Sequence, residues 1–186
     1  MLSKTIPGTN IEYRNNKEAS QVIEEMIEIT GGLSLSQICK ITNLQTSTIQ
    51  NWVKRKYVPR PDHKKYYERH ISRILLISAL RECMNIEDIG ELMSMINGDT
   101  DDETDDIISE TRLYDYFCKA ISKLDLMSLN DEQISKTIID LLKDETVYKE
   151  RLVCGLKVMV YAYISGRCLN EINNNLNKLK IYQEVR

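Results

Sequence analysis

The sequence predicts a mainly α-helical protein that carries one small β-wing. Along most of the 186 residues, apolar side chains recur at helical spacing between capping and turn residues, which is the pattern of amphipathic helices. Two of the three prolines, Pro59 and Pro61, stand together where one such helix ends and the chain extends. The basic and aromatic segment 63–67 follows them, and its composition favours a strand of a short wing.

Residues 1–32 are expected to form an N-terminal arm and one helix. Pro7, Gly8 and few apolar residues indicate an irregular lead-in. An amphipathic helix is predicted over 17–29, and the glycines at 31 and 32 are expected to end it, because glycine readily adopts the left-handed conformation found after many helices. The predicted buried face of this helix consists of Val22, Ile23, Met26 and Ile29.

Residues 33–96 are expected to form a second unit built on two helices and a turn. Ser34 and Gln37 are spaced as a capping box at the start of the first helix. Asn43 follows where the chain has to turn, in a conformation that Asn tolerates well. The second helix starts in the polar run 45–48, and its predicted buried face consists of Ile49, Trp52 and Val53. The opposite, outer face carries Ser47, Gln50, Asn51 and Lys54.

Positive charge is concentrated in the same stretch. Between residues 34 and 82 there are ten Lys and Arg residues against three Asp and Glu residues, which gives a local net charge of +7. The whole chain carries a net charge of −3 and has a pI of about 5.5. A basic block inside an acidic chain indicates binding to a polyanion such as nucleic acid.

The stretch from about 33 to 95 resembles the DNA-binding domain of the MerR family of bacterial transcription regulators. The matching segments are 35–40 in the first helix, Thr-Ile-Gln-Asn-Trp at 48–52 in the recognition helix, Tyr-Val-Pro at 57–59 at its exit, Lys-Tyr-Tyr at 65–67 in the wing and 80–89 at the end of the domain. Pro59 followed closely by Lys-Tyr-Tyr and then His70-Ile71 resembles more closely a bacterial family labelled domain of unknown function 1836.

The chain departs from the MerR pattern at named positions. Asn43 stands for the turn glycine, Gln50 for the recognition arginine and Asn51 for the tyrosine that follows it. The wing is also shorter than in typical MerR proteins.

The resemblance implies a transcriptional regulator whose second helix enters the major groove of DNA while the wing lies on the phosphate backbone. Base reading would come from Ser47, Gln50 and Asn51, since Gln and Asn can bind adenine through two hydrogen bonds. Phosphate contacts are expected from Lys54, Arg55, Arg60, Lys64, Lys65, Tyr67, Arg69 and Arg73. The alternative is a protein–protein adaptor, in which the winged helix is a scaffold and the helical C-terminal half binds a partner.

After a helix from about 86 to 95, the composition changes to an acidic run without a basic residue before Arg112. Residues 97–110 are therefore expected to be an acidic linker, and 111–186 a helical domain for dimerisation or effector binding. Its helices are predicted over about 105–124, from 130, over 145–164 with Gly166 as a break, and over 169–182. The last helix spaces four apolar residues as an a/d seam, which fits either ordinary core packing or a homodimer. These residues are Leu169, Ile172, Leu176 and Leu179.

Several classes of function are not expected. The five cysteines are irregularly spaced without a CxxC pair, so neither a metal nor a cofactor is predicted. The sequence has no nucleophile–base pair and no phosphate-binding loop, so an enzyme is not expected. Without an N-terminal hydrophobic signal region, and with an apolar run (158–164) too short to span a bilayer, a cytoplasmic protein without membrane contact is predicted. One set of aromatic residues fits either an effector pocket or plain core: Tyr116, Phe117, Tyr148, Tyr161 and Tyr163.

Overall fold

The computed structural model describes residues 5–12, 19–124 and 130–184. Within these ranges it contains eight helices and no β-strand, so the helical class is confirmed. The predicted strands of the wing are wrong for the described residues, because segment 62–66 forms isolated bridges instead of a ladder. The helices are α1 (Ala19–Thr30), α2 (Leu35–Thr42), α3 (Thr46–Lys54), α4 (Glu68–Leu80), α5 (Ile86–Asn97), α6 (Glu110–Lys123), α7 (Asp131–Leu141) and α8 (Lys149–Glu184).

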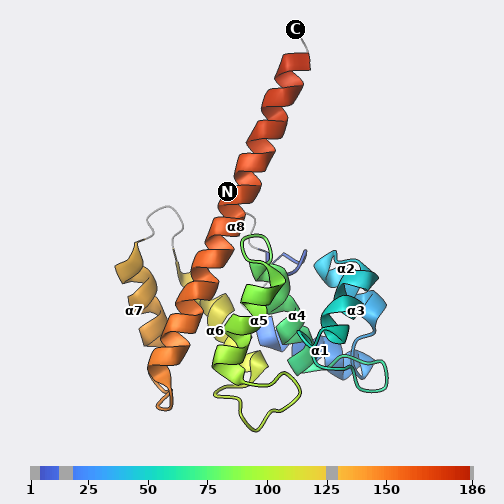
Figure 1. The fold of residues 1–186 in the computed structure, drawn as a ribbon, viewed down its shortest axis with the longest axis vertical. Helices are drawn as coiled ribbons and strands as arrows, with labels where there is room; N and C mark the ends of the chain where they lie inside the picture. Colours follow the sequence, from blue (N-terminus) through green and yellow to red (C-terminus); the bar gives the residue numbers. More distant parts are fainter. Residues whose placement is uncertain (1–4, 13–18, 125–129, 185–186) are drawn as a thin grey trace.

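Helix α4 is the centre of the fold. It packs against α1, α2, α5, α6 and α8, and in Figure 1 it lies between the α1–α3 group and the C-terminal helices. Every side chain from Ile71 to Ile77 is buried, which is expected of a helix surrounded on all sides. The N-terminal and C-terminal parts of the chain, which were predicted as separate units, therefore both pack against α4.

Helix α1 buries most of its predicted face, since Ile23 is buried and Val22 and Met26 are half-buried against the core. Ile23 and Ile27 are buried, whereas Ile29 is 85% exposed. The predicted placement of Ile29 on the buried face is therefore wrong, and Ile27, one turn after Ile23, takes its place. The predicted end of the helix is confirmed: Gly31 and Gly32 have φ of 60° and 91°.

Helix α8 is one continuous helix of 36 residues, so the predicted break at Gly166 is wrong. Gly166 is buried, and a Cβ built on it would lie 2.8 Å from the Cβ of Glu82. Gly155 has a similar environment, where a Cβ would lie 2.6 Å from Ile96 Cδ1. Both glycines let α8 approach its neighbours closely, which is a packing role and not a break.

The second half of α8 stands clear of the other helices (Figure 1). Earlier in the helix, Val158 and Tyr161 are 43% and 41% exposed, so the apolar run 158–164 is not buried on all sides. Among the described helices, α8 over Lys149–Ile181 is long and apolar enough to cross a membrane by length and composition alone. Core helices of soluble proteins meet the same criterion, and 39% of its most apolar window is buried.

Candidate functional site

The outer face of α3 is polar and exposed. Ser47, Gln50, Asn51 and Lys54 all point to solvent, and no hydrogen bond within the described part of the chain involves their side chains. On the opposite face, Ile49 is 0% and Trp52 5% exposed. The apolar anchor thus fixes how α3 is rotated and leaves its polar face free for a ligand.

Helix α2 and the turn before α3 form as their sequence predicts. The Ser34 N–H donates to Gln37 Oε1 at 2.8 Å, and the Gln37 N–H donates to Ser34 Oγ at 3.4 Å, which completes the capping box. Asn43 ends α2 in the left-handed region, with φ 57° and ψ 27°. Cys39 Sγ lies 3.7 Å from Thr46 Oγ1 and links α2 to α3. The position of α3 is therefore set mainly by local signals.

A tight hairpin follows α3 where the wing was predicted. The Lys65 N–H donates to the Asp62 carbonyl at 2.7 Å, and the two central residues, His63 and Lys64, have φ of 45° and 64°. Positive φ at both central residues is typical of the type I′ turn of two-residue hairpins. Behind it, Tyr66 exchanges backbone hydrogen bonds of 2.8 and 2.9 Å with Leu33. This short hairpin, which follows α3 in the chain, presents Lys64 at an exposed tip.

Tyr66 anchors the hairpin to the core. Its side chain is 3% exposed, and burial raises the pKa of its hydroxyl above the ordinary value, with a smaller contribution from Cys39. Tyr67 is half-buried instead, and a Cβ on Gly32 would lie 3.1 Å from its ring. Its backbone N–H donates to His70 Nδ1 at 3.2 Å. Both tyrosines therefore pack the hairpin against the body.

Three of the predicted phosphate ligands are free cations. Lys54, Arg60 and Lys64 are exposed and form no ion pair with any other described residue. Along the chain, they stand at the last residue of α3, on the segment that leaves it and at the hairpin tip. An exposed, unpaired cation retains its full charge for a polyanion.

Three others already have partners within the protein. Arg55 Nη2 lies 2.7 Å from Glu87 Oε1, and this contact raises the pKa of Arg55 and lowers that of Glu87. Lys65 Nζ donates to the Gly32 carbonyl at 3.0 Å, beyond the end of α1. Arg69 Nη1 lies 2.8 Å from Glu103 Oε1. Their contribution to a positive surface is smaller than their number suggests.

Arg73, one of the predicted phosphate ligands, is buried inside the protein. Its side chain is 3% exposed and forms an ion pair with Glu110, whose side chain is 1% exposed. Its Nε also donates to the Tyr57 carbonyl at 2.7 Å. A guanidinium enclosed in this way cannot reach a phosphate at the surface, so Arg73 is a structural residue.

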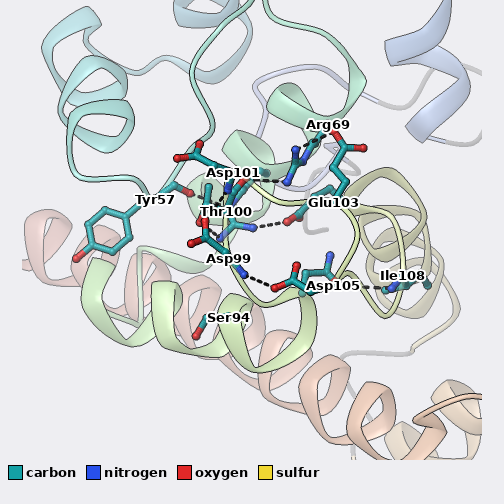
Figure 2. A network of polar contacts seen from close by, with 12 residues as sticks. Tyr57, Arg69, Ser94, Asp99, Thr100, Asp101, Glu103, Asp105 and Ile108 are labelled. Carbon is teal, nitrogen blue, oxygen red and sulfur yellow. Dashed lines mark hydrogen bonds and ion pairs between the residues drawn. The ribbon is translucent and has the colours of Figure 1, made fainter.

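The acidic run between α5 and α6 folds back onto α4 (Figure 2). Thr100 accepts from both α4 arginines, through its carbonyl from Arg69 Nη2 at 2.8 Å and through its Oγ1 from Arg73 Nη2 at 3.0 Å. Asp101 lies 3.6 Å from Lys56 Nζ. We call residues 99–106 the acidic strap. Its carboxylates offset part of the basic block that the sequence shows beside α3.

Turns built on aspartate give the acidic strap its shape. Asp99 Oδ1 accepts from the Asp101 N–H, and Asp102 Oδ1 accepts from the Thr104 N–H, at 2.8 and 2.9 Å. The bonds from Thr104 lower the pKa of Asp102 below its ordinary value. Asp105 Oδ2 accepts from the Asp99 N–H at 2.9 Å and closes the loop. Helix α6 then begins at Glu110, later than the predicted start near 105.

The aromatic residues considered for an effector pocket do not gather in one cavity. Phe117 and Tyr163 are buried, with ring centroids 5.7 Å apart in an edge-to-face contact. Tyr116 is 8% exposed and donates from its hydroxyl to Glu145. Tyr148 and Tyr161 are 62% and 41% exposed. The buried three are core residues, and the other two belong to the surface.

The four residues of the predicted seam lie on the free half of α8. Leu169, Ile172, Leu176 and Leu179 are 45%, 54%, 49% and 59% exposed. Core packing within one chain, the first alternative, therefore does not account for them. None of the five cysteines forms a disulfide. Among the described residues there is no group of three or more His, Cys, Asp or Glu placed to hold a metal ion.

The fold and this surface define an all-helical protein with an exposed polar helix, a basic hairpin and an acidic strap. Residues 17–117, just over half of the chain, match the family described as Domain of unknown function (DUF1836), and the chain belongs to that family. It is 26% identical over 138 residues to the uncharacterised protein YkrK of Bacillus subtilis (strain 168). The alignment covers 70% of this chain and 58% of YkrK, so the chain spans less than two thirds of that relative. No solved structure matches the chain.

Proposed function

We propose that the protein is a DNA-binding transcriptional regulator of MerR-like architecture. The observation that carries the proposal is the outer face of α3, where Ser47, Gln50 and Asn51 are exposed without partners on a helix anchored by Ile49 and Trp52. Polar side chains on the exposed face of an anchored helix are what reading of base edges in the major groove requires. Gln50 and Asn51 supply paired donors and acceptors suited to adenine.

Phosphate binding falls to the free cations around this helix. Lys54, Arg60 and Lys64 have no intramolecular partner among the described residues, and Arg55 contributes once it leaves Glu87. Each phosphate that is neutralised releases counterions, so binding weakens as salt increases. Arg73 is left out because it is buried.

The proposed regulator acts as a homodimer joined along α8. The exposed seam from Leu169 to Leu179 repeats at a/d spacing, and Asn173 and Asn175 flank it without charge, so two copies meet there without repulsion. A two-fold dimer presents two copies of α3, which matches a symmetric DNA site with two half-sites.

The test is selection from a random duplex library, followed by affinity measurements over a salt series. The double variant Gln50→Ala/Asn51→Ala is expected to keep its salt dependence and lose its sequence preference. The double variant Lys54→Ala/Lys64→Ala is expected to bind all sequences more weakly, with a salt slope lower by up to about 2.

The matched control is Lys136→Ala/Lys143→Ala, which removes two exposed lysines in and just after α7. It is expected to bind as the wild type does. If the wild-type protein shows no binding to duplex DNA at low salt, the proposal is rejected.

The second candidate is a protein–protein adaptor, and the surface of α8 favours it. Exposed apolar residues extend from Val158 to Leu179 along that helix, and the acidic strap offsets part of the basic block. An adaptor would bind a partner protein through α8 while remaining indifferent to DNA. The salt series above separates the two, since only the regulator binds duplex DNA.

A further inference from the structure

A cleft of about 500 Å³ opens between the start of α4, the acidic strap and the start of α6. Arg60, Arg69 and His70 line one side of it, and Asp106, Ser109 and Glu110 line the other. It shares Arg60 with the cations proposed to bind phosphate, but none of the three proposed base-reading residues lines it.

Two carboxylate oxygens at this cleft are buried and have no hydrogen-bond partner among the described residues. Glu110 is 1% exposed; its Oε1 is paired with Arg73, while its Oε2 has no hydrogen-bond partner. Asp106 Oδ1 is in the same condition. Buried acceptors are nearly always satisfied in folded proteins, because an unpaired one loses its hydration without compensation. These two oxygens therefore point to a donor that comes from outside the chain.

The charges around the cleft favour a cationic donor. Glu68, Asp101 and Glu103 add three carboxylates to its lining, and the guanidinium of Arg69 is already bonded to Glu103 and to the Thr100 carbonyl. Counting Arg60 as well, the lining has five carboxylates against two guanidinium groups and so keeps an excess of negative charge.

Burial and the neighbouring carboxylates both act on Asp106. Its pKa is raised to about 6, first by burial, then by the charge of Glu110 and by those of Asp105 and Glu103, with Arg69 acting in the opposite direction. A cation bound between the two carboxylates would relieve both the repulsion and the unmet hydrogen bonds.

We propose that this cleft binds a small organic cation through an ammonium group placed between Asp106 and Glu110. A primary ammonium carries three N–H donors, enough for both free oxygens, and its charge matches the lining. A metal ion is a poorer match, since the described residues provide no group of three or more side chains placed to hold one.

The test titrates the full-length protein without DNA, using putrescine as the probe and calorimetry at pH 7.5 as the measurement. Saturable binding with one putrescine per chain is the expected result. Tetramethylammonium, which has the positive charge but no N–H donor, is expected to bind at least tenfold more weakly, and Mg²⁺ likewise. Equal binding of tetramethylammonium would overturn the proposal, since it would show attraction by charge alone. This comparison uses the wild-type protein and depends on no variant.

The substitution Asp106→Asn removes one of the two carboxylates and is expected to weaken putrescine binding at least tenfold. The matched control is Asp140→Asn, an exposed carboxylate of α7, which is expected to leave binding unchanged. Circular dichroism verifies that both variants are folded. If the two carboxylates simply share a proton between them, putrescine will not bind at pH 7.5, and the proposal fails.

Discussion

Arg73 shows how position decides the role of a charged residue. Within one turn of α4 it is flanked by Ile71, Ile74 and Leu75, all of them buried. An arginine among such residues is rare unless a carboxylate accompanies it, and here Glu110 of α6 does so. The apolar neighbours of Arg73 are typical of a buried position, whereas the sequence-based prediction counts Arg73 as surface charge.

Replacing Arg73 by Met is expected to lower the free energy of unfolding by about 3–5 kcal/mol, because Glu110 is left buried with an uncompensated charge. Urea denaturation measures this change. The matched control is Arg112→Met, which breaks a more exposed pair with Glu145 (side chains 54% and 16% exposed) and should cost at most about 1 kcal/mol. Equal effects of the two substitutions would show that the burial of the Arg73 pair has no energetic weight.

Because the pKa of Asp106 is raised, we expect the free energy of unfolding to depend on pH. Its pKa is raised to about 6 from 3.8, so between these values the folded protein holds a proton that the unfolded chain has released. The contribution of Asp106 to the free energy of unfolding is fully present below pH 3.8 and is lost as the pH rises towards 6. Asp106→Asn should therefore unfold at higher urea concentration than the wild type at pH 7, and at a similar concentration at pH 4. If the urea midpoints of the variant and the wild type differed by the same amount at pH 7 and pH 4, the raised pKa would be contradicted.

At the scale of secondary-structure elements, caps and turns could be predicted from the sequence, whereas the packing of one helix against another could not. Ser34, Gln37 and Asn43 act within a few residues of themselves, and the structure confirms the cap and the turn that they predict. Gly166 has a high intrinsic cost in a helix, yet α8 continues through it. A glycine is needed at this position because Glu82, a residue far away in the sequence, approaches it closely. Periodicity alone does not show which helix will lie against a glycine.

The proposed dimer depends on the exposed apolar seam of helix α8. Wild-type protein is expected to elute as a dimer of twice 21.6 kDa in size-exclusion chromatography with light scattering. Ile172→Glu/Leu176→Glu should yield the monomer, because four carboxylates would face one another across the seam. Asn174→Glu/Asn177→Glu, on the outer side of the same helix, is the matched control and should remain dimeric. A monomeric wild type at micromolar concentration would reject the dimer.

At the scale of the molecule, the acidic strap is what sequence reasoning missed. Its composition and its place between two helices are typical of a solvated linker, so the sequence predicted one. Two signals argue otherwise in retrospect. Arg69 and Arg73 lie on a helix whose buried residues are mostly apolar, so they require carboxylates. In addition, aspartates spaced by two or three residues suit consecutive turns. Which carboxylate meets which arginine depends on how α4 and α6 pack, and this is not encoded locally.

The strap and α5 also predict how DNA affinity is adjusted, if the proposed function holds. Glu87 and Asp101 hold Arg55 and Lys56 at the exit of α3, and both pairs are exposed enough to open at little cost. Glu87→Gln/Asp101→Asn releases two cations towards the phosphate backbone. The expected result is tighter binding at low salt and a salt slope that increases by up to about 2. Glu132→Gln/Asp140→Asn changes the net charge equally on α7, far along the chain from α3, and should alter affinity much less. Equal gains from the two double variants would mean that overall charge, and not the release of Arg55 and Lys56, controls binding.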